Sequence, residues 1–249
     1  DLNRVIIKSI SAEEAQTFTD ILEDYTNYMI ENPNSLITRI YGLYKISWES
    51  LGIALNLIVM KNVCGFSAEF IERKFDLKGS QYDRKVLKEG DYNNPQKLKE
   101  KTLKDLDFLK TEKTLKIPEE KKELLYMIIE KDVSFLYKCQ LIDYSFALFI
   151  INKKLYEDHG NSISSHFTVI NPYGSIGSAE DDRLQYNMGI IDFLQRYTLQ
   201  KKMEKNIKKI VNLNTKLDTS SQDPTFYKDR FLRFTRKILD LEDRLTISK

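Results

Sequence analysis

The chain has 249 residues, of which 39 are Lys or Arg and 37 are Asp or Glu, so its formal net charge is only +2. This length allows one large domain, or two lobes that share a cleft, with a substantial apolar core. The near-neutral charge excludes an overall basic surface of the kind that attracts nucleic acid, so any attraction to an anionic partner must come from local clusters.

The first third of the chain predicts a small mixed sheet with one helix against it. Residues 4–10 favour a strand in which Lys8 is either exposed at a sheet edge or held in a cleft. A capping box then opens an amphipathic helix over residues 12–31. Two runs of β-branched and aromatic residues, 37–47 and 51–60, predict a hairpin.

The middle of the chain gives weaker signals. Lys78 and Arg84 flank a glycine-containing turn and could converge on an anion, although an ordinary turn would look the same. Residues 87–116 are polar and rich in lysine, so we predict mostly loop, with residues 103–108 as a local anchor. Pro118 then opens a helix at its favoured first position, so the second lobe begins to look helical.

Two aspartates interrupt apolar runs. Asp143 lies within residues 141–151, where we expect the chain to turn at the acid and enter a buried strand. Asp192 lies within residues 188–194, after an irregular excursion over 161–182. A buried carboxylate is costly unless it is paired, bound to a metal or catalytic, although a hydrogen-bonded turn acid is the plainer alternative. If both acids close on one cleft, they could serve as base and Mg²⁺ ligand in phosphoryl transfer.

A basic segment follows in the last quarter of the chain. Residues 200–209 contain five lysines and one glutamate, a local charge of 5 − 1 = +4. Interspersed apolar residues make this the composition of a segment that lies on an anionic membrane, although a solvated basic helix is the alternative. These lysines lack interleaved stacking aromatics, so we expect no nucleic-acid partner. Pro224 opens the final helix.

Membrane crossing and secretion are both disfavoured. No apolar run reaches the roughly 20 residues that span a bilayer. The two cysteines, Cys64 and Cys139, lie far apart and lack histidines at metal-binding spacing, which argues against a zinc site and against a disulfide-built secreted domain. We therefore expect a soluble protein of a reducing compartment, and the start at Asp1 leaves open that the sequence is a fragment.

Seven short motifs follow one another along the chain: Ile6-Ile7-Lys8, Asp76-Leu77-Lys78-Gly79-Ser80, Leu103-Lys104-Asp105 with Asp107-Phe108, Ile142-Asp143-Tyr144-Ser145, Ile190-Ile191-Asp192, Lys201-Lys202-Met203-Glu204, and Tyr227 with Arg230-Phe231. In this order they resemble the phosphatidylinositol phosphate kinase family over nearly the whole chain. The resemblance implies a single α+β, two-lobed lipid kinase catalytic domain with antiparallel sheets and flanking helices. Residues 1–65 would form part of the N-lobe, residues 66–249 the remainder and the C-lobe, and residues near 198–222 a specificity loop.

The resemblance also implies a nucleotide site that uses ATP and Mg²⁺. Lys8 would bind the nucleotide phosphates, Asn62 and Val63 would contact the base, and Asp192 would bind Mg²⁺. Ala147 stands where the family usually has Leu, at a position expected in the floor of the adenine pocket, so nucleotide affinity or base preference is in question. The strand of Lys8 begins almost at the first residue, so the two strands and glycine turn that normally cover the phosphates are not in this sequence, and we expect weaker ATP binding.

On the lipid side, the resemblance assigns Asp143 to orienting or deprotonating the inositol hydroxyl. Lys78 and Arg84 would lie near the headgroup phosphate. Lys201 and Lys202 match the dilysine that helps the specificity loop engage the membrane. The implied partner is a phosphoinositide in an anionic membrane surface, with a homodimer left open. The implied location is cytoplasmic, peripheral on the cytosolic face of a membrane, most naturally the plasma membrane.

Glu204 narrows the expected reaction. Family members that phosphorylate the 5-position tend to carry Glu here, so the chain resembles the type I enzymes that convert phosphatidylinositol 4-phosphate into phosphatidylinositol 4,5-bisphosphate. Three alternatives stay open: a phosphatidylinositol 3-phosphate 5-kinase, a 5-phosphate 4-kinase, and a catalytically silent phosphoinositide-binding module.

Overall fold

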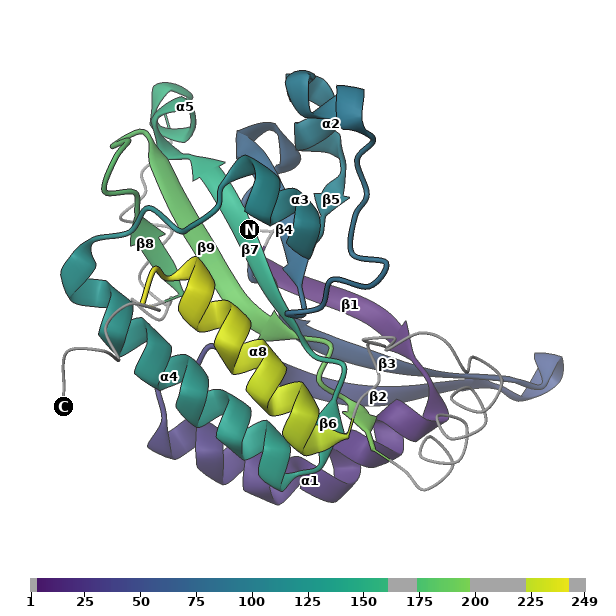
Figure 1. Cartoon of the computed structure of the whole chain (residues 1–249). Helices are drawn as coiled ribbons and strands as arrows, with labels where there is room; N and C mark the ends of the chain where they lie inside the picture. Colours follow the sequence, from purple (N-terminus) through teal and green to yellow (C-terminus); the bar gives the residue numbers. More distant parts are fainter. Residues whose placement is uncertain (1–3, 161–173, 198–222, 242–249) are drawn as a thin grey trace, which may run out of the picture.

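The computed structural model describes residues 4–160, 174–197 and 223–241 (Figure 1). Its strands are β1 (Val5–Ile10), β2 (Ile40–Trp48), β3 (Ile53–Lys61), β4 (Ile71–Leu77), β5 (Thr102–Leu103), β6 (Leu141–Ile142), β7 (Ser145–Asn152), β8 (Ser175–Gly177), β9 (Leu184–Ile191) and β10 (Gln195–Arg196). Its α-helices are α1 (Ala12–Glu31), α2 (Pro95–Glu100), α3 (Asp105–Thr111), α4 (Glu119–Lys138), α5 (Lys153–Asp158) and α8 (Pro224–Ile238). Short 3-10 turns are η2 (Glu49–Leu51), η3 (Ala68–Phe70) and η4 (Glu89–Asn93). The fold is α+β, as predicted.

The smaller sheet has the strand order β1-β3-β2 and lies beside α1 (Figure 1). Both of its strand pairs are antiparallel, so the predicted strand and hairpin are confirmed but the prediction of a mixed sheet is wrong. The side chain of Ser11 accepts a hydrogen bond from the backbone of Glu14, and the Glu14 side chain accepts one from Ser11, which starts α1 where the capping box predicts it.

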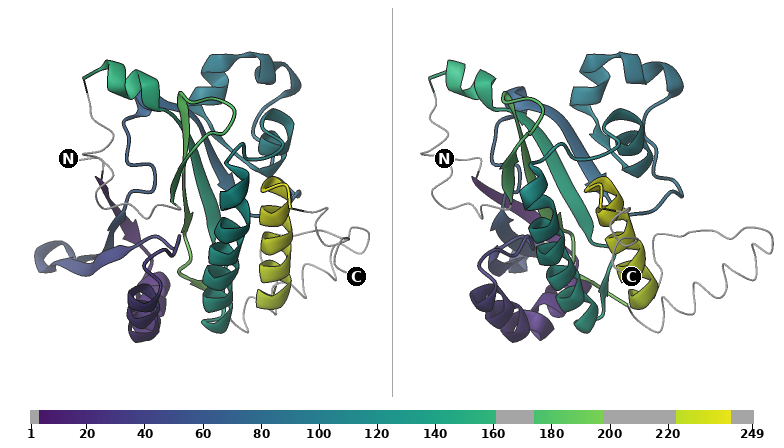
Figure 2. Two further views of the ribbon diagram at one scale, coloured as in Figure 1. Left: turned by 90° about the vertical axis from the view of Figure 1, so that its left-hand side faces the viewer. Right: turned by 60° about the vertical axis from the view of Figure 1, so that its left-hand side comes forward.

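The larger sheet has the strand order β5-β4-β7-β9-β8, and β10 pairs separately with β6. α4 and α8 lie side by side against one face of this sheet (Figures 1 and 2). Six of the eight side chains of β7 are buried, because this central strand has a neighbouring strand on each edge and helices on one face. The expectation of a helical second lobe is therefore wrong for its centre, which is a sheet, although α4 and α8 pack against that sheet.

Residues 87–116 are also more ordered than the sequence suggested. They form η4, α2, β5 and α3, so the prediction of a mostly irregular loop is wrong. The predicted anchor at residues 103–108 is confirmed, since Leu103, Asp105, Asp107 and Phe108 are all buried. A periodic pattern could not show this order, because short elements are held here by buried acids rather than by a long apolar face.

Residues 35–38, between α1 and β2, form a short strap that joins the smaller sheet to the larger one. The backbone of Ile190 in β9 donates to the carbonyl of Leu36 at 2.8 Å, and Thr38 donates back to Ile190 at 2.9 Å. Asp132 of α4 fixes the strap by accepting hydrogen bonds from the Leu36 backbone and the Tyr28 hydroxyl, each at 2.7 Å. Side chains from both parts consequently share one continuous apolar core. Within the residues described, no helix is long and apolar enough to span a bilayer.

Candidate active site

Asp143 and Asp192 lie at one junction in the strand pairing. β7 and β9 pair as far as Ser145 and Ile191, and β6 pairs with β10 beyond them. Asp143 lies between β6 and β7, and Asp192 lies between β9 and β10, so both aspartates lie in the gap between the two strand pairs. Backbone pairing therefore brings together two acids that are far apart in the sequence.

Both acids also have an unusual backbone conformation. The φ angle is 65° at Asp143 and 57° at Asp192, in the left-handed region that Asp tolerates better than most residues. Such a conformation costs on the order of 1–3 kcal/mol and persists only where the surrounding structure enforces it. The predicted turn at Asp143 before a buried strand is confirmed, and the same arrangement recurs at Asp192.

Lys8 reaches Asp192 across the cleft between the two sheets. Its ammonium nitrogen lies 2.5 Å from Oδ1 of Asp192, and the two side chains are 39% and 49% exposed. A small pocket beside this pair is lined by apolar side chains that include Ile10 and Ile58. Lys8 therefore combines the two alternatives that the sequence left open, since it belongs to an edge strand and its charge lies in a cleft.

Lys78 makes the equivalent contact with the other acid. Its ammonium nitrogen lies 2.9 Å from Oδ1 of Asp143, and the two side chains are 15% and 29% exposed. The backbone N–H groups of Lys78 and Gly79 donate to Asp105 at 3.0 and 2.6 Å, which fixes the turn after β4. Gly79 has a φ of 72°, and a side chain there would lie 3.0 Å from the carbonyl of Arg230, so this turn requires glycine.

Arg84 is buried inside the protein and points away from bulk solvent. Its Nε donates to Oδ2 of Asp105 at 2.6 Å, and its guanidinium also contacts the carbonyl and the carboxylate of Asp76. Burial raises the pKa of Asp105, and the guanidinium of Arg84 opposes that effect. The anion that Arg84 meets in the structure is thus an internal carboxylate, and its role at a lipid headgroup stays a prediction.

The residues assigned to the nucleotide base, Asn62, Val63 and Ala147, lie where the segment after β3 packs closely against the larger sheet. Ala147 of β7 pairs with Gly189 of β9 and is buried. A side-chain carbon on Gly189 would lie 2.9 Å from the Val63 side chain, so Gly189 lets the segment after β3 pack directly onto the larger sheet. The side chain of Asn62 accepts a hydrogen bond from the backbone of Cys64 at 3.1 Å, which shapes the same segment.

Comparison with known proteins decides the family. A family model described as Phosphatidylinositol-4-phosphate 5-Kinase matches residues 3–172 and 171–238. The chain belongs to this family. The resemblance inferred from the motifs is confirmed, and the roles that it implies for the acids and lysines described above stay predictions.

Individual relatives of the chain come from two branches of the family. Phosphatidylinositol 4-phosphate 5-kinase type-1 beta of Gallus gallus is 31% identical over 267 residues, which cover 92% of this chain and 47% of the relative. Phosphatidylinositol 5-phosphate 4-kinase type-2 gamma of Xenopus tropicalis is 29% identical over 276 residues, which cover 94% of this chain and 63% of the relative. The chain thus spans about half the length of the type-1 relatives that it matches.

Few residues in the described part of the chain could bind Mg²⁺. No group of three or more His, Cys, Asp or Glu side chains converges in the described part of the chain. Mg²⁺ is usually held by only one or two carboxylates together with phosphate oxygens and water, so a single half-exposed acid is sufficient from the protein. Asp192 meets that requirement, and it lies beside the lysine assigned to the phosphates.

Two residues that build this site, Asp107 and Tyr227, were visible in the sequence only as motif residues without an assigned role. Asp107 accepts hydrogen bonds from the backbone of Val86 and Leu87, so it positions the chain that follows the Lys78 turn. Burial raises the pKa of Tyr227 well above its ordinary value, so its hydroxyl stays protonated and donates to the carbonyl of Tyr144. Three further predicted residues, Lys201, Lys202 and Glu204, lie outside the described residues.

Proposed function

We propose that the chain is the catalytic domain of a lipid kinase that transfers the γ-phosphoryl group of ATP to the 5-hydroxyl of phosphatidylinositol 4-phosphate. The observation that carries the proposal is the pair of aspartates at one strand junction, each in contact with a lysine from a different element. Membership of a phosphatidylinositol phosphate kinase family supplies the chemical class. The domain organisation that we propose is one catalytic domain, in which residues 1–65 form part of the N-lobe and residues 66–249 form its remainder and the C-lobe.

Each residue of the junction has a role in this scheme. Lys8 neutralises charge on the ATP phosphates, and Asp192 binds Mg²⁺, which would supply further neutralisation of the phosphate oxygens. Asp143 accepts the proton of the inositol hydroxyl. The hydroxyl oxygen bonds to the γ-phosphorus as the bond between the γ-phosphorus and the departing ADP oxygen breaks. Lys78 holds Asp143 in place and adds positive charge on the lipid side. Phosphoryl transfer depends mainly on such positioning and charge neutralisation.

Fewer observations support the choice of the 5-hydroxyl than support the kinase reaction itself. Glu204 matches the residue that 5-kinases of the family tend to carry. The type-1 relatives are 31–32% identical to the chain and the type-2 relatives 28–30%, a difference too small to decide the substrate. The proposed site of action is the cytosolic face of a membrane, with the plasma membrane as the first candidate, because the substrate is a membrane lipid.

The test is phosphate transfer from labelled ATP to vesicles that carry phosphatidylinositol 3-, 4- or 5-phosphate in separate assays, with the full-length protein. We expect preferred turnover of the 4-phosphate, and at least a roughly hundredfold loss on Asp143→Asn or Asp192→Asn. Asp240→Asn is the matched control, because Asp240 also has a left-handed backbone but lies after α8, outside the cleft.

Two results would contradict the proposal. Retention of the wild-type rate by both cleft variants would remove the assigned roles. Absence of turnover on every lipid, together with intact vesicle binding, would favour the silent phosphoinositide-binding module. Preferred turnover of another isomer, or unchanged preference after Glu204→Ala, would remove only the argument for the 5-position of the 4-phosphate.

A further inference from the structure

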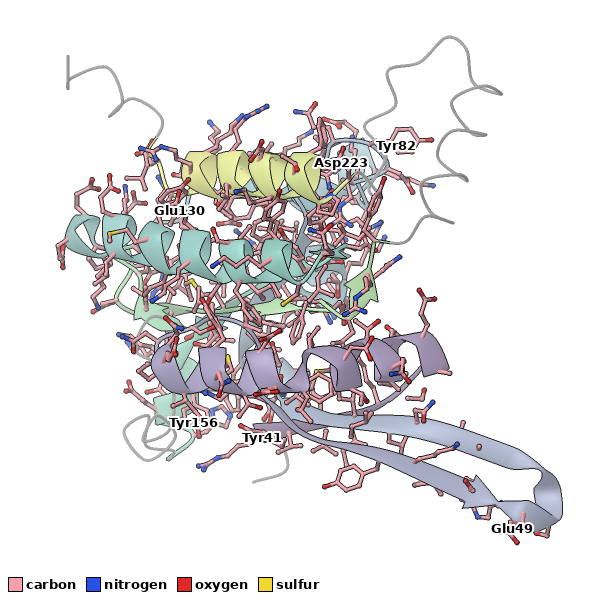
Figure 3. All side chains as sticks on the ribbon, turned by 90° about the horizontal axis from the view of Figure 1, so that it is seen from below. Tyr41, Glu49, Tyr82, Glu130, Tyr156 and Asp223 are labelled. Carbon is pink, nitrogen blue, oxygen red and sulfur yellow. The ribbon has the colours of Figure 1, made fainter. Side chains whose placement is uncertain are left out.

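The outer half of the β2–β3 hairpin projects from the body of the protein (Figure 3). β1 ends at Ile10, which pairs with Asn56, so beyond that point β2 and β3 pair only with each other. An isolated two-stranded hairpin is marginally stable in water. We therefore expect another surface to pack against this part of the hairpin and stabilise it.

One face of the projecting hairpin is apolar. Ile46 pairs with Leu55 and Trp48 pairs with Ile53, and directly paired residues point to the same face of a sheet. Alternation along the strands adds Tyr44 to this face, and the register with β1 adds Ile7. The exposed fractions are 55% for Tyr44, 37% for Ile46, 46% for Trp48, 46% for Ile53, 42% for Leu55 and 65% for Ile7. We call these six residues the hairpin face.

The opposite face of the same strands is different. Lys45, Ser47, Ala54 and Asn56 alternate with the hairpin face, so the projecting part is amphipathic across its thickness. Nearer the body, this second face turns inward at Ile58, which is only 1% exposed. Large apolar side chains are thus concentrated on the side that the described part of the protein leaves uncovered, which is typical of an interaction site.

The size of the hairpin face favours a membrane over a second copy of the chain. Six side chains exposed to this extent present on the order of 600 Å², below the ~800 Å² per partner of a standard protein interface. Insertion at a bilayer surface has no such threshold, since each buried group contributes separately. Trp and Tyr are also the residues that membrane interfaces favour.

The position of the hairpin agrees with this choice. Glu49 at the hairpin tip and Tyr82, in the loop after β4, lie at the same end of the molecule (Figure 3). That loop begins with Lys78, which contacts Asp143, so a few residues connect the acid assigned to the lipid hydroxyl with this end of the molecule. A lipid headgroup held at Asp143 would therefore place the bilayer within reach of the hairpin.

We propose that the hairpin face inserts into the headgroup and upper acyl region of the bilayer that carries the lipid substrate, as a membrane anchor separate from the basic segment. This inference rests on the proposed function, because it takes the bilayer to lie where the substrate enters. Trp48 and Ile53, the pair nearest the tip, then enter the lipid, while Lys45 on the other face stays in water.

Trp48 permits a direct test, because it is the single tryptophan among the 249 residues. The probes are vesicles of phosphatidylcholine with and without phosphatidylinositol 4-phosphate, and vesicles with brominated acyl chains. We expect a blue shift of the Trp48 emission on binding, and quenching by the brominated lipid. Unshifted, unquenched emission from vesicle-bound protein would overturn the proposal.

Adjacent residues on the two faces provide the matched variants. Ile53→Ser should lower the affinity for vesicles about tenfold, because a large apolar group no longer leaves water. Ala54→Ser, on the polar face, should leave the affinity unchanged. Both residues are exposed, so thermal unfolding should show the same stability for the two variants. Equal vesicle binding by the two variants would contradict the proposal.

A short-chain, water-soluble phosphatidylinositol 4-phosphate separates this inference from the proposed function. Ile53→Ser should retain turnover of the soluble lipid and show reduced turnover on vesicles at limiting lipid concentration, whereas Asp192→Asn should lose both. If wild-type protein turned over neither lipid but Trp48 still entered the bilayer, the proposed function would fail and the anchor would stand. A blue shift that grows with protein concentration in the absence of vesicles would instead identify the hairpin face as a contact between copies and overturn the anchor.

Discussion

Asp132 should make the stability of the protein depend on pH in a sense opposite to that of most acids. This carboxyl lies on α4 and is 1% exposed, and it holds the strap at Leu36 and the hydroxyl of Tyr28. Burial raises its pKa from 3.8 to about 6, against the lowering effect of the hydrogen bonds that it accepts. The folded protein therefore binds this proton more tightly than the unfolded chain does.

The sign and size of the effect follow from that difference. A carboxyl whose pKa is raised by folding stabilises the folded state below the unfolded pKa, and this contribution disappears as the pH rises through the folded pKa. A shift from 3.8 to about 6 corresponds to roughly 3 kcal/mol in total, of which about 2.5 kcal/mol is lost between pH 4 and pH 7. Asp181 acts in the opposite direction, since its hydrogen bonds with Arg183 lower its pKa to about 2.

Comparison with Asp132→Asn isolates the effect, because the other acids titrate alike in both proteins. The difference in the free energy of unfolding, wild type minus variant, should fall by about 2.5 kcal/mol from pH 4 to pH 7 when measured by urea unfolding. The exposed Asp24→Asn on α1 is the control, because it removes a carboxyl that does not hold the strap. A difference for Asp132→Asn that stays constant from pH 4 to pH 7 would refute the argument from burial.

Two further substitutions test other parts of the site. Arg84→Met leaves the carboxylate of Asp105 buried without its guanidinium partner, so urea unfolding should show a loss of about 3–5 kcal/mol; unchanged stability with a raised KM for lipid would show instead that Arg84 serves the headgroup. Gly189→Ala places a carbon 2.9 Å from the Val63 side chain, so calorimetry should show weaker ATP binding and a stability loss of about 1–3 kcal/mol. Val63→Ala in the same protein should restore part of both losses, and independent effects of the two changes would contradict the packing argument.

Sequence periodicity predicted the elements that have a long apolar face. The strand β1, the helix α1 and the hairpin all begin and end within a few residues of their expected positions, and the final helix begins at Pro224, as predicted. The two anomalous aspartates were equally visible, because a charge in an apolar run stands out against its neighbours. The sequence alone could not show that each acid has a lysine partner, since Lys8 and Lys78 reach them from distant elements.

The parts that escaped prediction depend on contacts between polar groups. The order in residues 87–116 comes from Asp105 and Asp107, whose carboxylates accept backbone N–H groups from the preceding loop. Such an acid has the same appearance in a sequence whether it is buried or solvated. For the same reason the surroundings of Arg84 were not foreseen, because an arginine beside a glycine turn resembles a phosphate ligand until its internal partner is known.

Burial then separates the ion pairs of the cleft into two kinds. The pair of Lys8 and Asp192 is about half exposed, and exposed ion pairs contribute only about 0–1 kcal/mol to stability. A nucleotide phosphate can therefore replace Asp192 as the partner of Lys8 at little cost. The pair of Arg84 and Asp105 is almost fully buried, and loss of one partner would leave a charge without compensation. In the proposed kinase, the exposed pair is therefore the one that rearranges when substrate binds, while the buried pair keeps the turn of Lys78 in place throughout the reaction.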